Sequence, residues 1–210
     1  MISARGLQFK DWSTNYKLLK KLDLKEFYNV LRQKSVALII SSNLIVAHID
    51  DTLIRKTGKK VFGTSWKRDP LGPKFHTNFV WGQRFLQTSI SVPNQTNGKA
   101  SKAIPVGFEH CPLPVKPKKN KATAEDWVKY KQAQSENKLS IKGRQAILNL
   151  REQLNNDGHT NRVLCMSVDG SYTNSAILKY LPNNTILVGR IRKDTKLFEI
   201  PIETNSNGKV

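Results

Sequence analysis

The chain has 210 residues, which is enough for one globular domain with modest additions. Its 35 Lys and Arg residues outnumber its 16 Asp and Glu residues, so the formal net charge is +19 at pH 7. This excess argues against an acidic small-molecule enzyme and favours a polyanionic partner, with nucleic acid ahead of a membrane surface. Apolar runs are too short to span a bilayer, and the first residues lack the apolar stretch of a secretory signal. We therefore expect a cytoplasmic protein without a membrane partner.

The first third of the chain predicts helix followed by a buried strand. Apolar residues recur at helical spacing over residues 13–35, and a break near Asp23 would divide this stretch into two short helices. The β-branched and apolar run that follows is typical of a strand buried on both faces. We place this strand at residues 44–49, with Asp50 and Asp51 at its carboxyl end.

A polar loop over residues 54–74 follows, and its charge predicts contacts with phosphates. It contains one acid, Asp69, and seven basic residues, Arg55, Lys56, Lys59, Lys60, Lys67, Arg68 and Lys74. Trp66 lies among them and has two interpretations: it either anchors the loop by burial or stacks on an unpaired base. The sequence leaves this choice open.

The second half of the chain predicts alternating strands and helices. Residues 77–110 indicate an antiparallel hairpin, and residues 140–154 indicate a helix with one apolar face formed by Gly143, Ile147, Leu150 and Leu154. A short strand at residues 162–170 carries Asp169 near its end. A small helix at about residues 174–180 and a last strand at residues 184–194 complete the order.

Two of the expected strands thus have carboxylates at their ends, Asp51 and Asp169. In an open α/β sheet the carboxyl ends of neighbouring strands meet at one crevice, so the two side chains would come together. Paired carboxylates beside a basic surface suit Mg²⁺ or Mn²⁺, which would connect them to a phosphodiester. The alternative explanation is structural, because a strand-end aspartate often caps the backbone that follows.

Three segments resemble the DDE-superfamily transposases of bacterial insertion sequences. HIDDTLIRKTGKK is similar to their first catalytic-aspartate region, MSVDGSYTNSAILKYLPNNTILVGRIRKD to their second, and SKAIPVGFEHCPL to the strand before their central helix. The resemblance covers residues 44 to about 200. It implies an α/β, ribonuclease H-like fold with a mixed sheet of about five strands and flanking helices. It also implies a nucleoid-associated enzyme that cuts and joins DNA ends with Mg²⁺ and forms a homodimer on DNA.

Under this resemblance Asp51, which precedes Thr52, is the first catalytic and metal-binding carboxylate, and Asp169 is the second. Asp50 is the alternative first ligand, but adjacent strand residues point to opposite faces. We assign DNA contacts to Arg55, Lys56, Lys59, Lys60, Lys67, Arg68, Arg190, Arg192 and Lys193.

The family's third carboxylate, a glutamate on a downstream helix, has no counterpart here. Glu199 and Glu203 lie in a segment that favours an extended conformation. We therefore expect residues 36–210 to form a catalytic core without its C-terminal part, and residues 1–35 to be the helical end of a DNA-binding region. Such a chain would bind DNA but cleave it poorly by itself. The alternatives are a DNA-binding remnant without catalysis and an independent ribonuclease H-like nuclease or resolvase.

Three other residues receive structural interpretations. His48, beside Ile49 on the first strand, is interpreted as a packed side chain rather than a catalytic one. Cys111 and Cys165 are too few for a disulfide framework and lie outside any metal-binding spacing.

Overall fold

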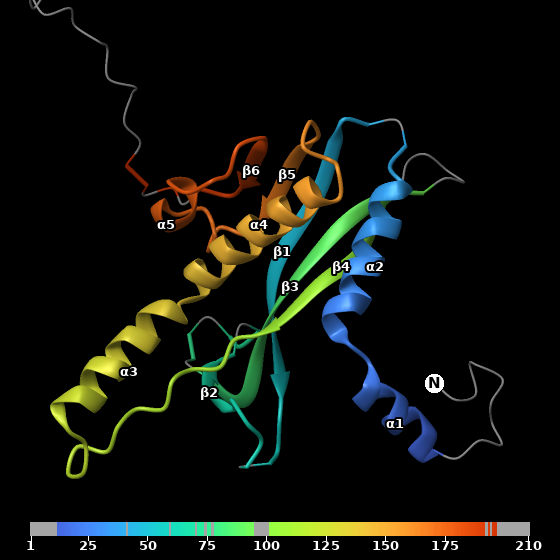
Figure 1. The fold of residues 1–210 in the computed structure, drawn as a ribbon. Helices are drawn as coiled ribbons and strands as arrows, with labels where there is room; N and C mark the ends of the chain where they lie inside the picture. Colours follow the sequence, from blue (N-terminus) through green and yellow to red (C-terminus); the bar gives the residue numbers. More distant parts are fainter. Residues whose placement is uncertain are drawn as a thin grey trace, which may run out of the picture.

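The computed structural model describes residues 12–40, 42–58, 60–69, 71–73, 75–76, 78–94, 101–191, 193 and 195–196. They form an α/β fold in which an open mixed sheet is flanked by helices (Figure 1). The strands are β1 (Leu44–Arg55), β2 (Ser65–Arg68), β3 (Phe79–Pro93), β4 (Ser101–His110), β5 (Val163–Val168) and β6 (Thr185–Gly189). The helices are α1 (Trp12–Lys21), α2 (Leu24–Ala37), α3 (Ala124–Glu136), α4 (Leu139–Asn156) and α5 (Ser175–Leu178).

Strand β1 lies at the centre of the sheet. It pairs antiparallel with β3 on one side and parallel with β5 on the other, and β5 pairs parallel with β6. The far edge of β3 is shared, because β2 pairs with its first residues and β4 with the rest. The predicted mixed sheet and the predicted hairpin of β3 and β4 are both confirmed.

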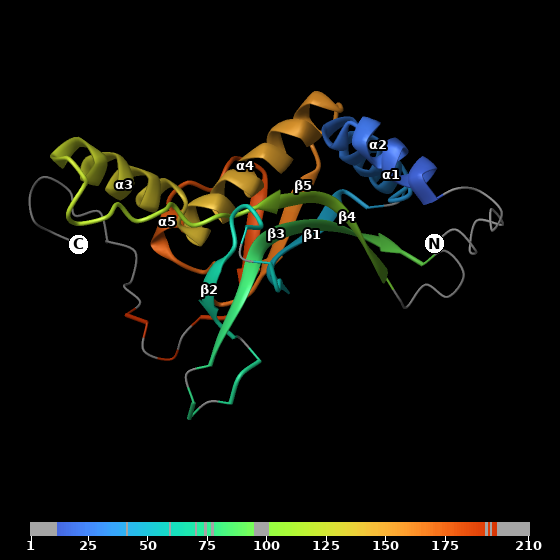
Figure 2. The same ribbon diagram turned by 90° about the horizontal axis from the view of Figure 1, so that it is seen from below.

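The core lies between the sheet and two helices, α2 and α4, which cover the same face (Figure 2). From β1, the residues Ile45, Ala47 and Ile49 are at most 2% exposed, and Leu164 and Met166 of β5 are fully buried. Helix α4 buries the predicted apolar face of Gly143, Ile147, Leu150 and Leu154. No helix in the described residues lies over the opposite face of the sheet.

The N-terminal stretch does divide at Asp23, as the sequence predicts. The Asp23 carboxylate accepts hydrogen bonds from the backbone N–H groups of Lys25, at 2.9 Å, and Glu26, at 3.3 Å, and so caps the start of α2. Helix α2 then packs on β3 and β4, and Val36 near its end is 1% exposed. This helix therefore contributes to the core of the sheet domain.

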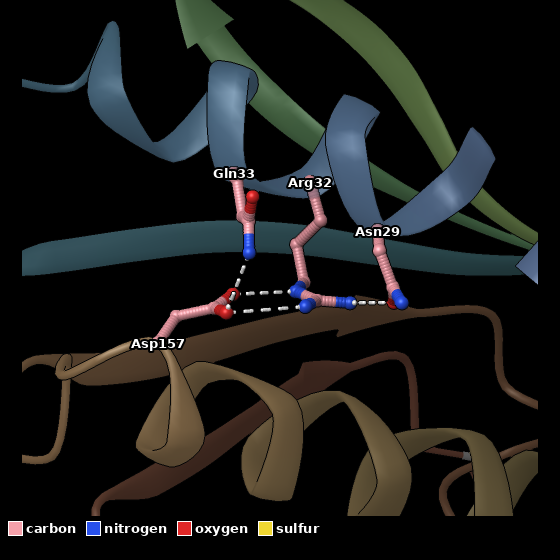
Figure 3. Close-up of polar contacts among 4 residues, drawn as sticks. All are labelled: Asn29, Arg32, Gln33 and Asp157. Atoms are coloured by element: carbon pink, nitrogen blue, oxygen red, sulfur yellow. Dashed lines mark hydrogen bonds and ion pairs between the residues drawn. The ribbon is translucent and has the colours of Figure 1, made fainter. Parts of the chain in front are cut away.

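An ion pair fastens α2 to the end of α4 (Figure 3). Arg32 Nε donates to Asp157 Oδ2 at 2.8 Å, and Arg32 Nη2 and Gln33 Nε2 donate to Oδ1 at 3.3 and 3.1 Å. Arg32 Nη1 donates to Asn29 Oδ1 at 2.8 Å. Burial opposes ionisation of Asp157, but the hydrogen bonds from Arg32 and Gln33 and the Arg32 charge leave its pKa below the usual value. Both the Arg32 guanidinium and the Asp157 carboxylate therefore have several hydrogen-bond partners.

Two sequence-based expectations were wrong in detail. Strand β1 continues through Asp50 and Asp51 to Arg55 because β3 pairs with it along this whole length, as far as Arg55 opposite Gly82. The predicted loop at residues 54–74 contains a strand, β2, which pairs with the start of β3. Both differences have one cause: a distant partner strand supplies hydrogen bonds to residues whose polarity suggested a loop.

The remaining predictions concern His48, the two cysteines and membrane-spanning helices. His48 is a packed side chain, and its Nε2 lies 2.6 Å from Ser91 Oγ. Cys111 is buried, Cys165 is half-buried, and both are free thiols. No helix in the described residues is long and apolar enough to cross a membrane.

Candidate active site

The candidate site begins at Asp51, which lies within β1 on the face that the helices cover. The odd-numbered residues before it point into the core, and Asp51 continues this series with its side chain 24% exposed. Asp50 is exposed and belongs to the other face by strand alternation. The side chain of Asp51 therefore reaches the boundary between the core and solvent.

Two side chains from other elements contact the Asp51 carboxylate. Tyr172 Oη, from the turn after β5, donates to Oδ1 at 3.1 Å. Arg84 Nε, from β3, lies 3.3 Å from Oδ2 and forms an ion pair with it. This contact lacks hydrogen-bond geometry, and Arg84 Nε is buried without a hydrogen-bond partner among the described residues. The Asp51 carboxylate thus has a partner on each oxygen, but Arg84 Nε makes an ion pair without a hydrogen bond.

Tyr172 is positioned by close packing against α4. Its side chain is 1% exposed, and a Cβ placed on Gly143 would lie 2.7 Å from the Tyr172 ring. Burial, together with the negative charge and hydrogen bond of Asp51, raises the pKa of the Tyr172 phenol. The phenol therefore stays protonated at neutral pH, where it serves as a hydrogen-bond donor and not as a nucleophile.

Besides Tyr172 and Arg84, the side chain of Lys67 also lies in the surroundings of Asp51. Although it was assigned to DNA contacts, its side chain is only 6% exposed and lies on the same face of the sheet as Asp51. Burial and the nearby Arg84 charge lower the pKa of Lys67, while Cys111 and Asp51 act in the opposite direction. Its place in β2 puts it in the surroundings of the carboxylate instead of on an exposed loop.

The segment of Asp169 lies beside that of Asp51. Strands β1 and β5 are parallel neighbours, and their pairing extends to Ile49 opposite Val168, so Asp169 follows directly at the level of Asp50. Asp169 is exposed and its Oδ1 accepts from Gly170 N at 2.6 Å, while its carbonyl accepts from Tyr172 N at 2.9 Å. The expected adjacency of the two strands is confirmed. The turn-capping contact expected from the structural explanation is present as well.

The donor set determines which metals could be held. No group of three or more His, Cys, Asp or Glu side chains in the described residues is arranged to hold a metal ion. Mg²⁺ is commonly bound by one or two carboxylates together with substrate phosphates. The register places Asp169 level with Asp50, one residue before Asp51. Glu199 and Glu203 lie outside the described residues.

The remaining basic candidates have different surroundings. Arg55 Nη2 donates to Asp69 Oδ2 at 2.7 Å, and Asp69 is 7% exposed. Lys56 is half-buried, whereas Lys60, Arg68, Arg190 and Lys193 are exposed. Lys59 and Arg192 lie outside the described residues.

The sequence signalled some of these residues and missed others. Tyr172 and Arg84 were not predicted. The register of β1 and β3 brings Arg84 near Asp51, whereas Tyr172 reaches it from the turn after β5. For Tyr172 a partial signal exists, because it lies in the short turn directly after Asp169. No protein-family model, curated protein or solved structure matches this chain.

Proposed function

We propose that this chain carries the catalytic core of a DDE-type transposase, a protein that binds DNA to cut and join its ends. The observation that carries the proposal is the parallel pairing of β1 with β5, which brings the segments of Asp51 and Asp169 together. The net charge of +19 supports a DNA partner, because phosphates attract lysine and arginine irrespective of sequence.

A ribonuclease H-like fold is the structural part of this proposal. It is supported by the five-strand path β4-β3-β1-β5-β6, in which antiparallel and parallel pairs are combined. It is further supported by the position of α4, which follows β4 in the chain, precedes β5 and covers the sheet.

In the proposed site, Asp51 and Asp169 hold Mg²⁺ or Mn²⁺. When bound, such an ion activates water and neutralises charge on the reacting phosphate. Tyr172 orients Asp51 through its hydrogen bond to Oδ1. Arg84 and Lys67 add positive charge beside the carboxylate, where a phosphate oxygen would also be stabilised.

A DNA-binding remnant without catalysis is the second candidate function. The contacts of Asp51 favour it, since both carboxylate oxygens have protein partners and the described residues provide no third ligand. Positioning and charge stabilisation supply most of metal-assisted catalysis, so a site with two carboxylates should be weak. Both candidates require DNA binding, and they differ only in cleavage.

The test is incubation of the purified chain with supercoiled plasmid, with and without Mg²⁺ or Mn²⁺, beside an Asp169→Ala control. We expect binding that weakens steeply between about 50 and about 200 mM salt, with little Mg²⁺-dependent nicking and at most a trace with Mn²⁺. Robust Mg²⁺-dependent nicking that Asp169→Ala abolishes would favour an independent nuclease with a complete site. A chain that binds no DNA at any salt concentration would overturn both candidates.

A further inference from the structure

A second candidate site lies at the start of β3, away from the carboxylates. Trp66 of β2 pairs with Trp81 of β3, and together with Lys56 and Thr57 they line a cavity of about 340 Å³. Small-molecule pockets of this size are usually apolar with a few polar groups, which describes this lining.

The two tryptophans differ in how they are held. Trp81 Nε1 donates to the Gly58 carbonyl at 3.1 Å, which fixes its ring against the loop after β1. Trp66 meets Trp81 edge to face, with ring centroids 5.6 Å apart and planes at 63°. Trp66 is nevertheless 65% exposed. A tryptophan that anchored this loop by burial would be covered, so the exposure favours the other interpretation, a stacking surface.

The pocket opens on the face of the sheet opposite to Asp51. The neighbours of the two tryptophans, Lys67 and Val80, pair with each other and are buried on the Asp51 side. Because successive strand residues alternate between faces, Trp66 and Trp81 point the other way. The pocket is therefore separate from the candidate active site.

The charge around the pocket favours an anionic occupant. Lys56 lines it, and Lys60 and Arg68 are exposed on the adjoining segments. The single acid of residues 54–74, Asp69, is buried and paired with Arg55. An aromatic surface next to lysine and arginine side chains matches a nucleotide, whose base stacks while its phosphate is attracted to lysine.

We propose that this pocket binds an unpaired nucleobase of single-stranded DNA, which stacks on Trp66 while Lys56 contacts its phosphate. This inference rests on the proposed DNA-binding function and adds to it a specific feature of the substrate. A transposase core that meets DNA with unpaired bases would use the pocket to hold a strand displaced from the duplex.

The test compares binding of an oligothymidylate, an abasic oligonucleotide of the same length and a duplex by fluorescence anisotropy. Stacking on an aromatic side chain predicts that Trp66→Ala weakens oligothymidylate binding by about 5- to 100-fold. Binding of the abasic strand and the duplex should be unchanged. Trp66→Phe should retain most of the affinity, and Trp127→Ala on α3, the same change elsewhere, should have no effect.

Salt dependence separates the two parts of the pocket. Trp66→Ala should leave the slope of log affinity against log salt unchanged, whereas Lys56→Ala should reduce it by about 0.7 for a single strand. If Trp66→Ala binds oligothymidylate like the wild type while duplex binding is intact, this inference fails and the proposed function stands. Equal weakening for all three ligands would also overturn base stacking. If the wild-type chain binds no DNA, the proposed function itself fails.

Discussion

Two arginine–aspartate pairs in this molecule differ in how well their charges are satisfied. Arg32 and Asp157 are both nearly buried, and every polar atom named in their contact has a hydrogen-bond partner. Arg84 and Asp51 are more exposed and 3.3 Å apart, and Arg84 Nε has no hydrogen-bond partner among the described residues. The Arg32–Asp157 pair joins two helices, whereas the Arg84–Asp51 pair lies within the candidate site.

The comparison separates a structural role from a functional one. A buried pair with complete hydrogen bonding is costly to break, because either charge is left in the interior without its partner. A more exposed pair with incomplete hydrogen bonding contributes less to folding. We therefore expect the Arg32–Asp157 pair to determine stability and the Arg84–Asp51 pair to influence ligand binding.

Breaking the structural pair should have the largest effect. Asp157→Ala leaves Arg32 buried without a carboxylate, and we expect a loss of about 3 kcal/mol in the free energy of unfolding. Urea denaturation followed by circular dichroism measures it. Glu109→Ala is the matched control, since its ion pair with Lys142 is far more exposed and should cost less than about 1 kcal/mol. Equal losses in both variants would contradict the assigned difference.

The same pair predicts a pH dependence. The pKa of Asp157 is lower in the folded chain than its usual value of 3.8, so its contribution to stability is fully present above that value. It is lost as the pH falls through the folded-state pKa. Wild-type stability should therefore fall more steeply below pH 3.8 than the stability of Asp157→Asn, measured by urea denaturation across this range. Parallel curves for the two proteins would exclude this role.

A mutation in α4 should selectively affect the hydrogen bond of Tyr172 to Asp51. Gly143→Ala places a Cβ 2.7 Å from the buried ring of Tyr172, so this ring, which donates to Asp51, must shift. Overpacking destabilises a fold by about 1–3 kcal/mol, and the higher helix propensity of alanine stabilises it by up to about 1 kcal/mol. We therefore expect the free energy of unfolding to fall by about 1 kcal/mol. The pKa of the Tyr172 phenol should also fall, which absorbance titration at alkaline pH measures.

Gly158→Ala is a control with a different cause of destabilisation. Its φ of 87° is unfavourable for alanine, yet no atom lies near the added Cβ. Stability should decrease while the titration of Tyr172 stays unchanged. A Tyr172 titration that shifts equally in both variants would show that Gly143 has no special role.

How far the sequence predicts this molecule depends on the distance between interacting residues. The α4 helix follows from local periodicity, because Ile147, Leu150 and Leu154 mark its face without outside information. The surroundings of Asp51 do not, since the register of β1 and β3 brings Arg84 near and packing under Gly143 positions Tyr172. Local polarity likewise suggested a loop where β2 forms, which hid the burial of Lys67.

The smallest stability effect is expected at the site itself. Arg84→Met removes a half-exposed charge with incomplete hydrogen bonding, so we expect a change below about 1 kcal/mol. Arg32→Met is the matched change in the structural pair and should cost several times more, because it removes the cation from the largely buried Asp157 carboxylate and leaves it the hydrogen bond from Gln33. Urea denaturation of the two variants compares them directly. A larger loss for Arg84→Met would reverse the roles assigned to the two pairs.

Binding of Mn²⁺ tests the central claim, that Asp51 and Asp169 form a divalent-ion site in a DNA-binding core. Electron paramagnetic resonance measures free and bound Mn²⁺ with a DNA oligonucleotide present, because phosphates complete the coordination of such ions. Asp51→Asn and Asp169→Asn should each weaken Mn²⁺ binding by more than about tenfold, since even residues that only orient ligands contribute that much. Asp50→Asn, on the opposite face, should bind Mn²⁺ like the wild type. Unchanged binding in both Asp51→Asn and Asp169→Asn, or a loss only in Asp50→Asn, would contradict the claim.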